Sequence, residues 1–307
     1  MPITYVDKRE PAHFAGRPPK KREFKPSEII AMTDNILRSD RSNRRSFVLQ
    51  VLHEFVALSE STLYTLVHER VAISDNVNTF LRQLRLYRST GLILDVPFGV
   101  TKSAIRAGLS KPNTSSLRAY CLGPVGEEYV RRKGWYNNAP TQTTTQEHLA
   151  HDLICAEAML KMRTLWRSHS TNPGLAEVRG PREVSVWNAE KKAYFVAPDG
   201  LLIKRNLNGV FERAFLVEYQ NVRALLQVQN KLARYEELSK PEYRWVWDFW
   251  GLDEMPWVLV IYRQEATLRH YQVQLEQHAE LRAKYACSSL ADVWAGKLSI
   301  KPIRNQP

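Results

Sequence analysis

Two acidic residues in the C-terminal half of the chain are spaced so that they could act together. Asn208-Gly209 is a two-residue hairpin signal between two apolar segments that favour β-strands. The hairpin register centred on this turn sets Asp199 opposite Glu218, with Cβ atoms about 5 Å apart. Opposed carboxylates repel each other unless a cation or a shared proton neutralises them. Because carboxylate oxygens suit Mg²⁺, the spacing predicts a metal site; the alternative is two surface carboxylates at strand ends.

A divalent ion at such a site could activate water and stabilise the charge that develops on a scissile phosphate. The motifs of other enzyme classes are missing from the sequence, which has no P-loop, no GxGxxG after a strand, no GxSxG and no HxH pair. His148 and His151 have helical spacing, but no third ligand in sequence supports zinc. Three widely separated cysteines provide neither a disulfide framework nor a zinc knuckle. From the residues alone, metal-dependent phosphodiester chemistry and a pair of surface carboxylates without a ligand both remain open.

The elements around the two carboxylates are a helix, four strands, a helix, a strand and a final helix, which predicts a mixed sheet flanked by helices. We expect helices from 146, over 222–238 and over 265–284, and strands over 183–187, 193–197, 201–205, 212–219 and 257–263. The tryptophans of 245–257 are expected in the core or at a subunit contact, with base stacking as the alternative.

Residues 27–135 have the element order of a winged helix-turn-helix: helices near 27–38, 42–55, 61–67 and 74–91, then strands over 92–96 and 117–122. The expected buried stripe of the last helix is Val77, Phe80, Leu81 and Leu84. Its opposite face carries the side chains expected to read bases, which are Asn78, Arg82 and Arg85. The loop between the strands is expected to form a basic wing with Lys102, Arg106 and Lys111, and Arg118 follows in the second strand. A small helical domain with a solvated polar face is the alternative.

The net charge of +12 favours a polyanionic partner. Residues 1–26, rich in Pro and Lys/Arg, are expected to form a flexible basic arm that is either solvated or tracks DNA. The polar segment 136–145 is expected to link the first domain to a second over 146–307. No apolar run approaches the roughly 20 residues of a membrane span, and the N-terminus lacks a signal-peptide core, so we expect a cytoplasmic protein.

Short motifs in the C-terminal half resemble the PD-(D/E)XK nuclease core, namely APDG (197–200) and FLVEYQ (215–220) followed by a helix. From about residue 40 to 263 the chain is similar to the replication-relaxation family of plasmid and mobile-element proteins, and to MobC-type relaxases of mobilisable plasmids, which pair a winged helix with this motif. The matching segments also include RAYCLGPVGEEYV (118–130), HLAHDL (148–153) and NKLARYEEL (230–238). The resemblance implies an α+β fold with an N-terminal winged helix and a restriction-endonuclease-like domain.

The resemblance also implies roles for individual residues. Asp199 and Glu218 match the family's two acidic ligands and would hold Mg²⁺ or Mn²⁺. Gln220 stands where the family has its lysine, and Lys231 on the following helix is the candidate replacement, unless it is merely solvated. His151 matches a family histidine that could reach the site, with a purely structural role as the alternative.

Two functions remain open from the sequence. In the first, the protein recognises an origin or transfer site of a plasmid or mobile element and nicks double-stranded DNA there, as a relaxase-like endonuclease. In the second, it is a non-catalytic origin-binding, relaxosome accessory or regulatory protein with a degenerate nuclease core. Both predict DNA as the partner, alone or with other relaxosome or replication proteins, and either could act as an oligomer.

Overall fold

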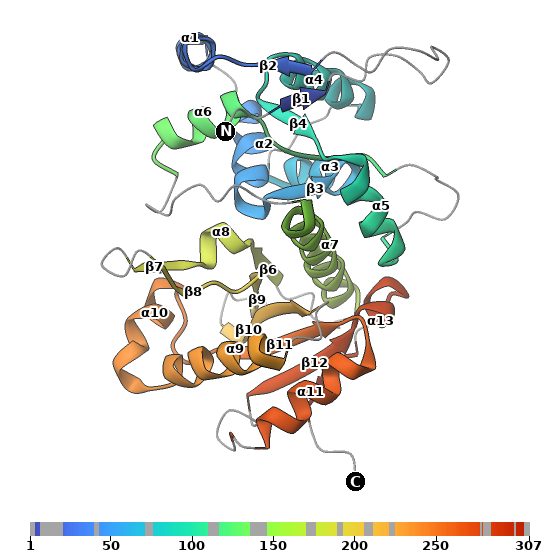
Figure 1. The fold of residues 1–307 in the computed structure, drawn as a ribbon, viewed down its shortest axis with the longest axis vertical. Coiled ribbons are helices and arrows are strands. Elements are labelled where there is room, and N and C mark those ends of the chain that lie inside the picture. Colours follow the sequence, from blue (N-terminus) through green and yellow to red (C-terminus); the bar gives the residue numbers. More distant parts are fainter. Residues whose placement is uncertain are drawn as a thin grey trace. The chain divides into compact units, whose positions relative to one another are not determined.

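The computed structural model combines helices with a mixed β-sheet, as expected for an α+β protein (Figure 1). It describes residues 4–6, 21–39, 43–70, 76–109, 117–135, 146–169, 176–188, 193–205, 211–220, 225–276, 278, 284–297 and 299–303. The N-terminal unit comprises Met1–His53, Ala57–Val96 and Arg118–Tyr136; the C-terminal unit comprises Glu54–Val56, Pro97–Leu117 and Asn137–Pro307. Within the described ranges, every helix is too short or too polar to cross a bilayer.

The N-terminal unit is built from helices around a small antiparallel sheet of order β3-β5-β4. Its elements are α1 (Pro26–Ser39), α2 (Asn43–Phe55), β3 (Ala57–Ser59), α3 (Glu60–Arg70), α4 (Val77–Ser89), β4 (Ile93–Asp95), β5 (Ala119–Leu122) and α6 (Pro124–Arg132). The strand β3 was not expected from sequence. Inside the expected arm, β1 (Thr4–Val6) pairs antiparallel with β2 (Lys21–Glu23).

Helix α4 buries Phe80, Leu84 and Tyr87. The prediction that Val77 belongs to this stripe is wrong, because Val77 is 48% exposed. The side chain of Asn76 caps the helix, so Val77 lies in the open first turn, before the helix reaches the core.

The C-terminal unit contains a six-stranded sheet of order β13-β12-β11-β10-β9-β6. Its strands are β6 (Ala176–Arg179), β7 (Val186–Asn188), β8 (Ala193–Val196), β9 (Gly200–Arg205), β10 (Phe211–Gln220), β11 (Trp257–Tyr262), β12 (Tyr285–Ser289) and β13 (Lys301–Pro302). Its helices are α5 (Phe98–Arg106), α7 (Gln146–His169), α8 (Pro181–Val184), α9 (Leu225–Leu238), the 3₁₀ turn η1 (Pro241–Tyr243), α10 (Arg244–Phe249), α11 (Glu265–Leu275) and α13 (Leu290–Trp294).

The sheet is mixed, since β10, β11 and β12 run parallel and the other neighbours are antiparallel. Three of its strands, β6, β12 and β13, were not expected from sequence. Two strands that were expected in it, β7 and β8, pair only with each other among the described residues.

The register predicted for the β9–β10 hairpin is confirmed. Val217 pairs with Gly200, and the Asp199 N–H donates to the Val217 carbonyl oxygen at 3.0 Å, which sets Asp199 beside Glu218. Next to the turn the register differs from the prediction, because Phe211 pairs with Arg205 instead of residue 206. The irregularity between Phe211 and Arg213 offsets this difference, so the predicted register holds from the Arg213–Lys204 pair to the Val217–Gly200 pair. The turn residues themselves fall outside the described ranges.

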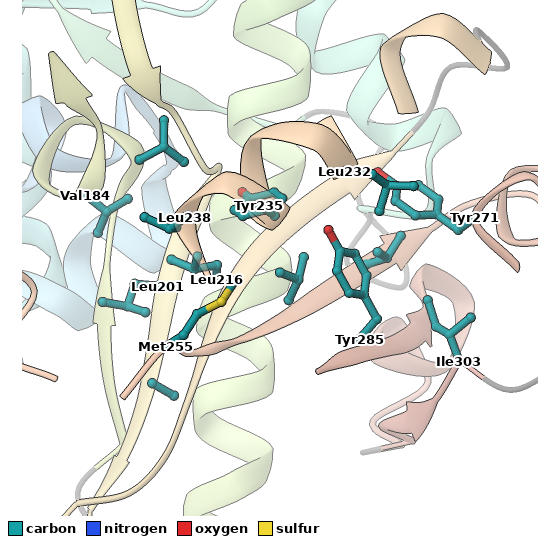
Figure 2. Close-up of a cluster of buried hydrophobic side chains, with 14 of the residues drawn as sticks. Val184, Leu201, Leu216, Leu232, Tyr235, Leu238, Met255, Tyr271, Tyr285 and Ile303 are labelled. Carbon is teal, nitrogen blue, oxygen red and sulfur yellow. The ribbon is translucent and has the colours of Figure 1, made fainter. Parts of the chain in front are cut away.

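The two faces of this sheet are covered by different helices. Leu201 and Leu216 pack with Leu232, Tyr235 and Leu238 of α9 in one apolar cluster (Figure 2). On the other face, α7 approaches the sheet so closely that a Cβ at Gly200 would overlap the sulfur of Met159. Glycine immediately after Asp199 therefore permits the close packing of α7 against the strand that carries the site.

The expected basic wing is wrong for Lys102 and Arg106, because both lie on α5, which packs against α7 in the C-terminal unit. The apolar periodicity explains the helix: Val100 and Ala104 lie one turn apart and are buried. Lys111 lies outside the described residues.

Candidate functional site

Side chains from four elements meet where β10 ends. Asp199 directly precedes β9, and Glu218 lies near the end of β10. Glu218 is only 1% exposed, although a carboxylate is seldom buried without partners. The partners come from the two helices that cover the sheet, α7 and α9.

Helix α9 supplies two partners of Glu218. Lys231 Nζ contacts Glu218 Oε2, and the Tyr235 hydroxyl donates a hydrogen bond to Oε1. These two residues lie four positions apart, so they share one helix face. The structure thus brings Lys231 to the carboxylate beside which the sequence analysis placed it.

The charges of Glu218 and Lys231 each favour the ionised form of the other group. Burial alone would lower the pKa of Lys231, but Glu218, followed by Asp199, raises it above its usual value, so the ammonium stays charged. Burial raises the pKa of Glu218, and the positive charge of Lys231 opposes this rise. The ammonium is thus what allows Glu218 to keep a negative charge in a buried position.

Helix α7 supplies His151 on the other side of the site. Its Nε2 lies 3.0 Å from the Tyr219 carbonyl oxygen and 3.5 Å from Asp199 Oδ2, while its Nδ1 lies 3.5 Å from Asp152 Oδ1. Asp199 Oδ2 also accepts a hydrogen bond from the Tyr219 N–H at 2.7 Å. Burial lowers the pKa of His151, but Asp199 and then Asp152 outweigh it and raise the pKa to about 9. His151 is therefore a second cation of the site at neutral pH.

Gln220 ends β10 on the same strand face as Glu218, and it is 5% exposed. Cys155, one turn after His151 on α7, is buried, with its Sγ 3.9 Å from the Asp199 carbonyl oxygen. Burial, followed by the negative charge of Asp199, raises the pKa of the Cys155 thiol, which favours its protonated form.

Oxygen donors at this site fit a divalent ion. The charge of Asp199 acts on Glu218, so both carboxylates belong to one site. Hard oxygen ligands are those that Mg²⁺ prefers, usually one or two carboxylates with several waters. Glu218 already forms an ion pair with Lys231. In the described part of the chain, no three acidic, histidine or cysteine side chains are grouped as a metal cage, so waters would complete the shell.

Sequence reasoning overlooked Tyr235 as a partner of Glu218 and Tyr219 as the residue whose backbone links Asp199 to His151. The spacing of four between Lys231 and Tyr235 was a usable signal for the first. The second could not be found, because backbone groups carry no sequence signature.

The residues expected to bind DNA are divided between the two units. Asn78, Arg82 and Arg85 are exposed on α4, and Arg118 is exposed just before β5; all four belong to the N-terminal unit. Lys102 and Arg106 are exposed on α5 in the C-terminal unit. The structure therefore brings the base-reading candidates together on one helix of the N-terminal unit and places Lys102 and Arg106 on a helix of the C-terminal unit.

The chain matches no known family model, and neither a curated protein nor a solved structure is significantly similar to it. The family resemblance seen in short motifs stays a prediction. The function has to be argued from the site itself.

Proposed function

We propose that this protein is a DNA-binding, metal-dependent endonuclease that nicks double-stranded DNA at a specific site. The observation that carries the proposal is the contact of Lys231 with Glu218, beside Asp199. Two carboxylates and a lysine are the groups that the nuclease motif needs, and here α9 supplies the lysine that is missing at 220. The element order α7-β6-β9-β10-α9-β11 supports the same reading, because it places these groups on a central hairpin and the crossover helix after it.

The N-terminal unit supports the DNA-binding half of the proposal. Its elements α2, β3, α3, α4, β4 and β5, with the three strands in one antiparallel sheet, resemble a winged helix-turn-helix, although α5 of the other unit lies between β4 and β5 in the chain. In this arrangement α4 would enter the major groove, and its exposed side chains Asn78, Arg82 and Arg85 suit base edges and phosphates. The resemblance to replication-relaxation and MobC-type proteins favours an origin or transfer site of a mobile element as the target.

Each group of the site has a distinct task in the proposed reaction. Asp199 and Glu218 would hold Mg²⁺ or Mn²⁺, which would supply an activated water and neutralise charge on the phosphate. Lys231 keeps Glu218 ionised and presents a positive charge at the place where negative charge builds up. His151 fixes the Asp199 carboxylate and the Tyr219 carbonyl group in position.

The test is a nicking assay on supercoiled plasmid carrying the DNA that flanks the gene of this protein, with Mg²⁺ or Mn²⁺. We expect the wild type to produce open circles and Asp199→Ala to bind the DNA with unchanged affinity but leave it uncut. Asp253→Ala, which removes an exposed carboxylate of the same unit, is the matched control and should cut normally. Replacing Arg82 and Arg85 by Ala should instead weaken binding and lower its salt slope by roughly one for each of the two arginines that binds a phosphate. Loss of binding in Asp199→Ala would contradict the separation of roles.

The second candidate is a non-catalytic DNA-binding protein. It is favoured by the engagement of both Glu218 oxygens, by Lys231 and Tyr235, and by the buried Gln220 at the lysine position. Tight, salt-sensitive binding without nicking in either metal would decide for this candidate.

A further inference from the structure

Helix α5 stands between β4 and β5 in the sequence, where a wing was expected, yet it is attached to the C-terminal unit. It packs against α7, and the Trp294 indole N–H donates to the Ala107 carbonyl oxygen at 2.9 Å. The chain then turns at Gly108, whose φ of +97° favours glycine, and a Cβ there would lie 2.6 Å from the Trp294 ring. The position of α5 is therefore fixed by contacts within the C-terminal unit.

This helix presents a positive face. Lys102 and Arg106 are exposed and lie four residues apart, so they project from the same side of α5. The segment 97–109 contains no acidic residue that would neutralise them.

Arg263 joins this positive face to the candidate site. It directly follows β11, and its NH2 group donates to the Arg106 carbonyl oxygen at 3.0 Å. The strand before Arg263 pairs with the strand of the site: Tyr219 pairs with Ile261 and Gln220 with Tyr262. Tyr219 is the residue whose backbone contacts Asp199 and His151.

The spacing of the strands gives the distance between Arg263 and Asp199. Gln220 pairs with Tyr262, so Arg263, which follows β11, lies at the same end of the strands as the site, two strands away from Asp199 before β9. Neighbouring strands are about 4.8 Å apart, so the separation across the sheet is about 10 Å.

We propose that Lys102, Arg106 and Arg263 form a phosphate-binding rim of the candidate nuclease site, which binds backbone phosphates of the DNA close to the phosphate at Asp199. This proposal rests on the proposed function. The rim would let the C-terminal unit bind DNA without the contribution of α4. The basic helix α5, which lies in the sequence where a wing was expected, would thus bind DNA for the C-terminal unit.

The experiment measures binding to a fluorescent duplex of unrelated sequence across a salt series, so that base reading does not contribute. The full-length chain carries Arg82→Ala and Arg85→Ala, which removes the contribution of α4. In this background we test Lys102→Gln and Arg263→Gln and compare each with the control Lys161→Gln. Lys161 is an exposed lysine of α7, about ten residues along the helix from His151.

We expect the slope of log affinity against log salt to fall by about 0.9 for each rim residue replaced and to stay unchanged in the control. Lys102→Gln breaks no contact within the protein that the structure shows, so a fall in its slope reports DNA binding and not misfolding. If both variants show the same slope of log affinity against log salt as Lys161→Gln, the proposed rim is wrong.

Nicking separates this proposal from the one on which it rests. With a wild-type α4, the rim variants should raise the KM for DNA several-fold and leave kcat within about twofold. If the wild type never nicks but the rim variants still lose slope, the rim stands as a DNA contact and the nuclease function fails. If the wild type nicks and the rim variants match Lys161→Gln in slope and KM, the rim fails and the nuclease function stands.

Discussion

Replacing Lys231 by Met should destabilise the C-terminal unit in a way that depends on pH. The change removes the ammonium from a carboxylate that is 2% exposed, whereas the lysine side chain itself is 31% exposed. Removing one partner of a fully buried ion pair costs about 3–5 kcal/mol; because Lys231 keeps part of its contact with water, we expect a loss of about 2–3 kcal/mol in unfolding free energy at pH 8.

The sign of the pH dependence follows from Glu218. Burial already raises the pKa of Glu218, and without Lys231 to oppose it the pKa rises further. A carboxyl group with a raised pKa in the folded state binds a proton on folding, so the folded state gains stability as the pH falls through that pKa. The deficit of Lys231→Met relative to the wild type should therefore shrink between pH 8 and pH 5.

Urea unfolding in EDTA at pH 8 and pH 5, followed by tryptophan fluorescence, measures both quantities. The double variant Glu218→Gln/Lys231→Met removes both charges and should recover most of the stability lost in Lys231→Met alone. Lys161→Met, at an exposed position on α7, should change little. A deficit of equal size at both pH values would refute the reasoning, because it would show that Glu218 does not carry an uncompensated charge in the variant.

Two further predictions concern the opposite side of the site. Gly200→Ala should lower the unfolding free energy by about 1–3 kcal/mol in urea unfolding, since its Cβ would overlap the sulfur of Met159 and lie 2.9 Å from the carbonyl oxygen of Arg179; an unchanged midpoint would mean that α7 does not lie so close. Asp199→Asn should lower the pKa of His151 from about 9, as followed by NMR of the ring, because it removes the carboxylate that contributes most to the rise. The raised pKa of His151 contributes stability that is fully present below pH 6.5 and is lost as the pH rises to about 9, so this loss should be smaller in Asp199→Asn; an unshifted titration would contradict the contact.

Local sequence signals were enough to predict the position of the two carboxylates. The register at the site end of β9 and β10 agrees with the one read from a turn signal and from alternation over about twenty consecutive residues, although the pair next to the turn is offset by one residue. The contact of Lys231 with Glu218 could be anticipated for a similar reason, because the helix after a strand folds back over the face of that strand.

The parts that were missed depend on contacts between distant segments. The strands β12 and β6 are five and four residues long, and they are stabilised by pairing with β11 and β9 rather than by their own composition. Helix α5 was mistaken for a wing because a basic segment between two strands resembles one. What fixes α5 is Trp294, which lies far away in the sequence and cannot be connected with it by any local pattern.

The place of the lysine in this site has a physical explanation. A lysine at 220 would put its ammonium at a position that is 5% exposed, where the cost of removing a charge from water is high. Lys231 reaches the same carboxylate from α9 while its side chain keeps 31% of its exposure, so part of that cost is avoided. The neutral Gln220 fills the buried position without a charge, and Tyr235 satisfies the second oxygen of Glu218. A glutamine at the end of β10 is therefore compatible with a charged, working site, provided that the helix after the strand supplies the cation.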